Sequence, residues 1–136
     1  MGLAERRATK DFQDRVFPGL KADIEQQAGF PVELEVHWDE LAVEDYAGSY
    51  EGFWRKVYFD PTIAALSSVA RDDLGKDALK AGLTKIVFRN AAGHYSPESA
   101  VSFTGGVVTI DHAPSSNVDD VEPRAAYLIT ILEKGL

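Results

Sequence analysis

Four titratable side chains alternate along one short stretch of the chain. Residues 32–39 read Val-Glu-Leu-Glu-Val-His-Trp-Asp, so one face of a predicted strand carries Glu33, Glu35, His37 and Asp39. Carboxylates beside an imidazole can perform general acid-base catalysis when their surroundings push their pKa values apart. The same alternation is typical of the wet side of a half-buried sheet, where Lys85 and Arg89 of another strand would pair with the carboxylates. We favour the second interpretation and predict no catalytic residue, and we take Glu33, Glu35 and His37 as candidates for ligand or interface contacts.

The histidines are His37, His94 and His112, and a metal site would need two of them or added carboxylates. His37 and Asp39 project from one side of the predicted strand, but Asp111 and His112 point to opposite faces. No two histidines have the close spacing of a helical metal site. No serine lies in a nucleophile elbow, and no glycine-rich segment has the form of a phosphate loop. We therefore predict neither a metal nor a cofactor.

Aromatic residues gather in one segment and could form a recognition surface. Tyr46, Tyr50, Phe53, Trp54 and Val57 recur at helical spacing, which is typical of a core helix. Tyrosine and tryptophan also have polar atoms suited to an interface or to the wall of a ligand pocket. The candidates for ligand or interface contacts in this segment are Tyr46, Tyr50 and Trp54.

A second recognition candidate is the predicted loop 90–99. It is longer than a simple strand connection needs, and loops of this kind often carry binding residues. Its two candidates for such a role are His94 and Tyr95. The alternative is a plain solvent-exposed excursion of the chain.

The composition limits which classes of molecule are expected to bind this protein. The 136 residues carry a formal net charge of -8, which should repel nucleic acid and anionic membrane surfaces and favour a basic protein partner. The absence of cysteine excludes disulfides and thiolate catalysis. No apolar leader or bilayer-spanning run is present, so we expect a cytoplasmic protein.

The first half of the chain is predicted to be mainly helical. An amphipathic helix over 3–28 should be kinked or split at Pro18-Gly19 and closed by Gly29, and the half-buried strand 32–39 follows. An aromatic helix is expected within 44–58, then a helix that begins at Pro61 behind an Asp60 cap. That helix should bend or break near Gly75 and end at Gly82 in a left-handed cap.

The second half is predicted to contain most of the sheet. A strand over 84–89 has Ile86 and Phe88 on its apolar face, and the loop 90–99 leads into a hairpin over 100–112 that turns at Gly105-Gly106. A last helix opens at Asp119-Asp120 with Pro123 in its first turn.

These elements predict a single α+β domain over 1–136. We expect a two-layer sandwich with a roughly four-stranded mixed sheet, the last three strands in an antiparallel meander and the helices on one face. The leading functional hypothesis is a non-catalytic protein-binding module with an acidic, partly aromatic surface. The alternatives are a small-molecule or enzymatic pocket between sheet and helices, lined by aromatics and histidine, and a homo-oligomer formed through the open sheet face.

Overall fold

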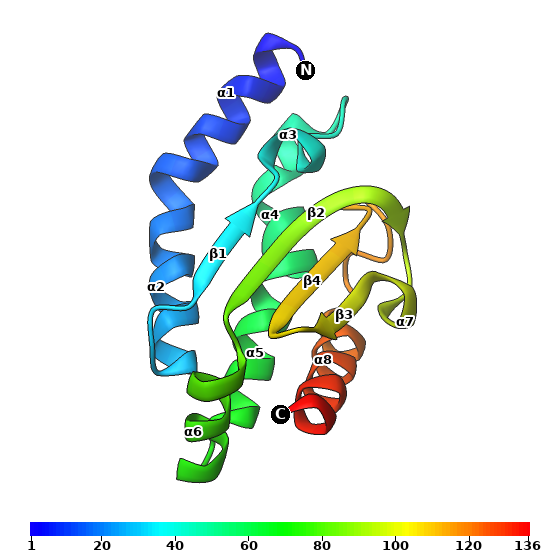
Figure 1. Cartoon of the computed structure of the whole chain (residues 1–136). Helices are drawn as coiled ribbons and strands as arrows, with labels where there is room; N and C mark the ends of the chain where they lie inside the picture. The colour runs from blue at the N-terminus through cyan, green and yellow to red at the C-terminus, as the bar shows by residue number, and fades with distance from the viewer.

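The computed structural model describes residues 1–136 and consists of two layers (Figure 1). Four strands form one sheet in the order β1-β2-β4-β3, and helices cover one of its faces while the other is open. The strands are β1 (Glu33–Val36), β2 (Lys85–His94), β3 (Val101–Thr104) and β4 (Val107–His112). This confirms the α+β class, the four-stranded mixed sheet and the placement of the helices on one face.

The antiparallel meander predicted for the last three strands is corrected by the register. Strands β3 and β4 form the expected antiparallel hairpin, with positive φ at Gly105 and Gly106, but β2 pairs with β4 in parallel. The short helix α7 (Pro97–Ala100) lies between β2 and β3, and β3 occupies the outer edge. The second arm of the hairpin therefore returns beside β2. Strand β1 also pairs with β2 in parallel, so only β3 runs the opposite way.

The N-terminal helix runs through Pro18 instead of splitting there. It comprises α1 (Leu3–Asp11), a π-helical turn η1 (Phe12–Val16) and α2 (Phe17–Ala28), and Gly29 ends it in the left-handed conformation as predicted. Proline lacks an amide proton, and its ring crowds the carbonyl four residues earlier. The wider π turn lies directly before Pro18, where the amide of Phe17 bonds to the carbonyl of Phe12.

A second long helix repeats this arrangement. After the 3-10 turn η2 (Ala47–Ser49) come α4 (Tyr50–Trp54), the π turn η3 (Arg55–Phe59) and α5 (Asp60–Val69). The predicted helix start at Asp60-Pro61 is wrong, because Phe59 and Asp60 are already helical and the amide of Asp60 bonds to the carbonyl of Arg55. The π turn accommodates Pro61 within a continuous helix.

Two predicted element ends differ in the structure, the first in its position and the second in its conformation. Strand β1 stops at Val36 because α3 (Trp38–Leu41) begins there and Trp38 packs on Phe17, with ring centroids 5.0 Å apart. Helix α6 (Asp73–Gly82) is capped by Asp72, and its last residue Gly82 has no positive φ, so the left-handed cap is absent.

The predicted loop 90–99 contains the end of β2 and the helix α7. The final helix α8 (Val121–Gly135) begins directly after the predicted Asp119-Asp120 start. None of the helices combines the length and apolar character that crossing a bilayer requires.

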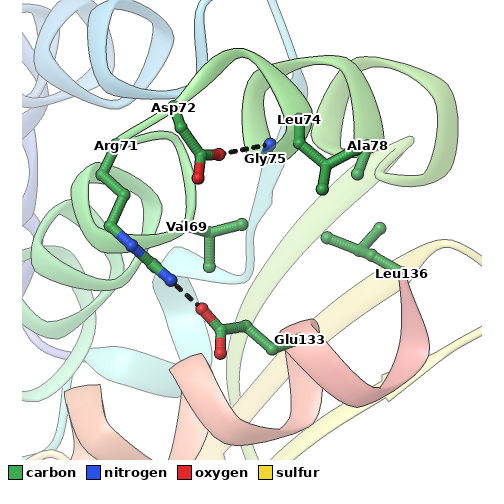
Figure 2. A pocket seen from close by; sticks show the side chains of 8 residues that line it. All are labelled: Val69, Arg71, Asp72, Leu74, Gly75, Ala78, Glu133 and Leu136. Carbon is green, nitrogen blue, oxygen red and sulfur yellow. Dashed lines mark hydrogen bonds and ion pairs between the residues drawn. The ribbon is translucent and has the colours of Figure 1, made fainter.

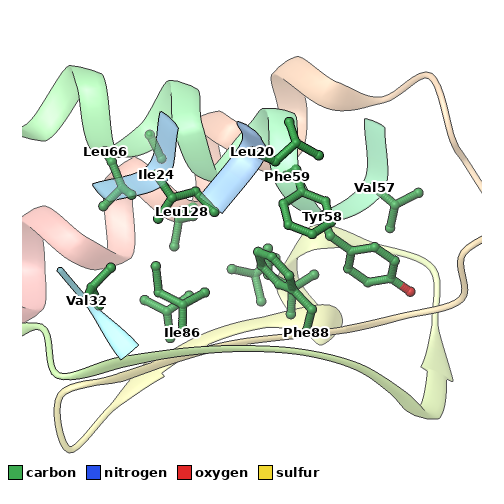
Figure 3. Packing of buried hydrophobic residues seen from close by; sticks show 14 of the residues in the cluster. Leu20, Ile24, Val32, Val57, Tyr58, Phe59, Leu66, Ile86, Phe88 and Leu128 are labelled. Atoms are coloured by element: carbon green, nitrogen blue, oxygen red, sulfur yellow. The ribbon is translucent and has the colours of Figure 1, made fainter. Parts of the chain in front are cut away.

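The core lies between the sheet and the helices (Figure 3). Ile86 and Phe88 project from β2 toward Phe59, Leu66 and Leu128, all of which are buried. An aromatic group joins the two π turns, since Phe12 lies with its ring centroid 4.9 Å from that of Trp54 and 5.8 Å from that of Phe59. The helices therefore cover one sheet face and leave the polar residues of the strands on the other.

Candidate functional site

The open sheet face carries the alternating acidic residues, and a lysine neutralises part of their charge. Glu33 and Glu35 lie opposite Lys85 and Val87 in the register. The Lys85 Nζ lies 2.7 Å from Glu35 Oε1 and 3.5 Å from Glu33 Oε2, which confirms the predicted cross-strand pairing. This contact, followed by that of His37, lowers the pKa of the Glu35 carboxyl. The acidic row is thus an exposed ion network.

His37 belongs to the same network and has a carboxylate at each ring nitrogen. Its Nε2 lies 2.6 Å from Glu35 Oε2, and its Nδ1 lies 3.8 Å from Glu40 Oε2. Arg89 pairs with Glu40 at 3.2 Å instead of with the carboxylates of β1. A general base needs a ring nitrogen that faces the substrate. The arrangement of His37 therefore suits charge balance on the surface better than proton transfer to a ligand.

Replacing Lys85 with methionine tests this network. In Lys85→Met the pKa of the Glu35 carboxyl should rise toward its ordinary value, because its main hydrogen-bond partner is lost. The unfolding free energy should change little, since the pair is exposed to solvent and screened by it. Carboxyl-resolved NMR titration measures the pKa, with Lys80→Met as an exposed control. An unchanged Glu35 pKa would contradict the pairing.

Tyr50 and Trp54 are placed in the core and present no surface to a ligand. Both side chains are buried and their rings stack at 4.6 Å. The Tyr50 hydroxyl donates to the Val43 carbonyl at 2.6 Å, and Trp54 Nε1 donates to the Leu41 carbonyl at 3.1 Å. Their polar atoms are therefore used to hold the segment that follows α3. Of the three aromatic candidates, only Tyr46 is exposed, at 45%.

His94 and Tyr95 lie at the end of β2. Tyr95 is exposed, and its carbonyl accepts a hydrogen bond from the Asn117 side chain at 2.7 Å. His94 stands opposite His112 in the register, after a shift that follows Arg89. No hydrogen bond or ion pair joins these two residues to the network around His37. The structure thus separates the predicted candidates into different contact groups.

A groove beside Tyr46 brings together residues that sequence analysis did not group. Its volume is about 420 Å³, and it is lined by Gly48, Ser49, Gly52, Phe53, Lys56, Val118 and Asp119. One wall is the start of the second long helix, and the other is the connector, which we define as residues 113–120 between β4 and α8. The ring of Tyr46 lies 5.6 Å from that of Phe53, so it extends the aromatic side of the groove.

Two glycines leave the helical wall of this groove bare. A Cβ built on Gly48 or Gly52 would meet no atom within 4 Å, and neither residue has a positive φ. Nothing inside the protein therefore requires glycine at these positions. Glycine within a helix costs about 0.5–1 kcal/mol relative to alanine. We interpret the open space as room for the close approach of a second molecule.

Several carboxylates lie in the lining of the groove or close to its lining residues in the sequence. Glu44 and Asp45 are exposed and directly precede Tyr46, and Asp120 is exposed beside Asp119. Asp119 pairs with Lys56 at 2.7 Å, yet its side chain remains 85% exposed. Asp45 has a φ of 69°, which is uncommon for a residue other than glycine. Phe53 is the aromatic residue of the lining, with Asp119 and Lys56 as its charged residues. The two segments that form the groove carry five carboxylates against two basic side chains, Arg55 and Lys56. We call residues 44–56 together with 118–120 the acidic groove.

A second hollow lies between α6 and the end of α8, and Figure 2 shows its lining. Its volume is about 410 Å³, and its apolar residues are Val69, Leu74, Ala78 and Leu136. The polar groups there are engaged with each other: Arg71 pairs with Glu133 at 3.0 Å, and Asp72 accepts from the Gly75 amide at 2.8 Å. Neither hollow is lined by a histidine, and Phe53 of the groove is the one aromatic residue in the two linings.

No family model, curated protein sequence or solved structure shows a significant match to this chain. One signal of the acidic groove is visible in the sequence, because Gly48 and Gly52 are one helical turn apart. The opposite wall gives no such signal, since Val118 and Asp119 reach the groove only through the fold.

Proposed function

We propose that this protein is a non-catalytic binding module whose acidic groove receives a basic segment of a partner protein. The observation that carries the proposal is the pair of helix glycines beside an aromatic wall, with open space in front of both. Small residues on a helix let another backbone approach closely, and aromatic rings attract lysine and arginine side chains. The acidic groove carries five carboxylates against two basic side chains, and this excess together with the net charge of -8 supports a basic partner.

The ion pairs on the open sheet face also favour binding over catalysis. Its acidic residues are held in ion pairs, and both hollows lie elsewhere on the molecule. Enzyme pockets are concave sites in which a few polar groups converge on the ligand. The groups that could perform acid-base chemistry here face one another on a sheet surface. Binding therefore explains the arrangement better than catalysis does.

A photo-crosslinking residue at Ser49 would identify the partner in the host cell. We expect one dominant protein to be crosslinked from this position and not from an equivalent residue at Gly19, which is exposed on α2. The affinity of that protein, once purified, should fall at least about tenfold for Gly52→Leu, because the new side chain occupies the groove.

The matched control is Gly19→Leu, because Gly19 is another helix glycine with no neighbour within 4 Å of a built Cβ. Its affinity should equal that of the unmodified chain. The affinity should also fall as salt rises, and less steeply for Asp119→Asn. Equal binding by Gly52→Leu and Gly19→Leu would refute the acidic groove as the binding site.

A further inference from the structure

A buried histidine lies at the point where β4 passes into the connector. His112 is fully buried, and its Nδ1 lies 2.7 Å from the Ala113 carbonyl. A carbonyl only accepts, so Nδ1 carries the proton and Nε2 is left as an acceptor. The Nε2 atom is buried and has no hydrogen-bond partner. The neutral imidazole is therefore satisfied at one nitrogen, while a proton added at the other would have no acceptor.

A buried arginine holds the other end of the connector. Arg124 is 1% exposed and donates from Nη1 to the Asn117 carbonyl at 2.7 Å. Its Nη2 donates to the carbonyls of Val118 at 2.7 Å and Lys56 at 3.1 Å. No carboxylate lies within ion-pair distance of this guanidinium, so its charge is offset by the carbonyls that it contacts and by the more distant charges of Asp120 and Asp119. The Arg124 side chain thus ties the connector to the second long helix.

The groups around His112 make a second positive charge unfavourable. The charge of Arg124 from α8 and the neighbouring His94 of β2 both oppose an imidazolium, whereas Asp111 on the same strand favours it. Tyr58 from η3 donates its hydroxyl to the His112 carbonyl. Burial is the largest influence, and it lowers the pKa of the His112 imidazole.

We propose that His112 is a proton-sensitive lock on the connector, and hence on one wall of the acidic groove. Protonation places an imidazolium in a buried site that already holds a guanidinium and offers Nε2 no acceptor. Movement of the connector away from the core exposes the imidazolium to water. The same movement displaces Val118 and Asp119 from the groove. The link to binding rests on the proposed function, whereas the movement of the connector does not.

The direction of the effect follows from the sign of the shift. In the closed form the pKa of His112 lies below the free value of about 6.5. The closed form therefore has its full stability only above about pH 6.5, where the imidazole is neutral in both forms. As the pH falls below about 6.5, the open form gains protons that the closed form resists. The connector should therefore be closed at neutral pH and open increasingly in mild acid.

Hydrogen exchange of the full chain tests the lock. After correction for intrinsic rates, exchange in residues 113–120 should be about tenfold faster at about pH 5 than at about pH 7.5, while α5 stays protected. The variant His112→Asn keeps a donor for the Ala113 carbonyl but cannot take up a proton in this range. It should lose the acceleration, and the control His94→Asn should keep it.

Two results would overturn the lock. One is a connector whose protection is constant with pH, and the other is an acceleration that persists in His112→Asn. If that variant does not fold, NMR titration of the unmodified chain decides, since the His112 ring and the connector amides must share one midpoint. A connector that opens without any change in partner affinity would leave the lock intact and count against the proposed function.

Discussion

The Trp54→Ala variant should lose about 3–5 kcal/mol of unfolding free energy. Its side chain is fully buried, stacks on Tyr50 and meets the edge of Phe12 at 4.9 Å. Truncation removes these contacts and the hydrogen bond from Trp54 Nε1 to the Leu41 carbonyl, which keeps the Val43 amide as a donor. Chemical denaturation followed by circular dichroism measures the loss, which is a large share of the stability of an ordinary domain.

Two further variants separate packing from hydrogen bonding. Trp54→Phe keeps a ring in the core and should lose about 1–3 kcal/mol, through the smaller ring and the lost hydrogen bond to the Leu41 carbonyl, which still accepts from the Val43 amide. Tyr46→Ala should change stability by less than about 1 kcal/mol because the ring is exposed, yet it should weaken partner binding. A Trp54→Ala variant as stable as the unmodified chain would show that Trp54 does not lie in the core.

The Gly75→Ala variant should be destabilised by about 3 kcal/mol, although it adds only one methyl group. A Cβ at Gly75 would lie 1.7 Å from the carbonyl oxygen of Val69 and 3.2 Å from Asp72 Oδ1. The backbone between α5 and α6 must move to make room, and the Asp72 cap on the Gly75 amide is disturbed. Thermal unfolding should show a clear decrease in midpoint temperature.

At the acidic groove, replacing a glycine with alanine is expected to stabilise the protein instead. Gly52→Ala should raise the unfolding free energy by about 0.5–1 kcal/mol, because alanine favours the helix and its methyl group meets nothing. Comparing the two variants tests whether the space in front of the glycine is filled by the protein, as at Gly75, or open, as at Gly52. Equal effects of Gly52→Ala and Gly75→Ala would contradict the difference in their surroundings.

Patterns of period two and period 3.6 predict most elements of this fold. The hairpin turning at Gly105-Gly106, the apolar face of β2 and the final helix were all visible in local sequence. The prolines at 18 and 61 were read as helix boundaries, because the sequence does not show that a π turn precedes each. The order of β3 and β4 was missed for a related reason. A hairpin pattern specifies that two strands pair but not which of them joins the rest of the sheet.

The candidate site was harder to predict than the fold. Helical spacing correctly placed Tyr50 and Trp54 on one face, but that face points into the core. Tyr46 was identified, whereas the partners across the groove, Val118 and Asp119, are more than sixty residues away in the chain. The role proposed for His112 and the contacts of Arg124 depend on burial and on backbone carbonyls. No sequence pattern indicates either factor.

The position of β4 between β2 and β3 constrains how a nascent chain can fold. When residues 1–94 have emerged from the ribosome, both long helices, β1 and β2 have been synthesised. Strand β4, which pairs with the other edge of β2, has not. The last helix then supplies Leu128, Leu132 and the Arg124 side chain that holds the connector. Vectorial synthesis therefore leaves one edge of β2 unpaired and part of the core uncovered until late in translation, which is the period when a chaperone would have a surface to bind.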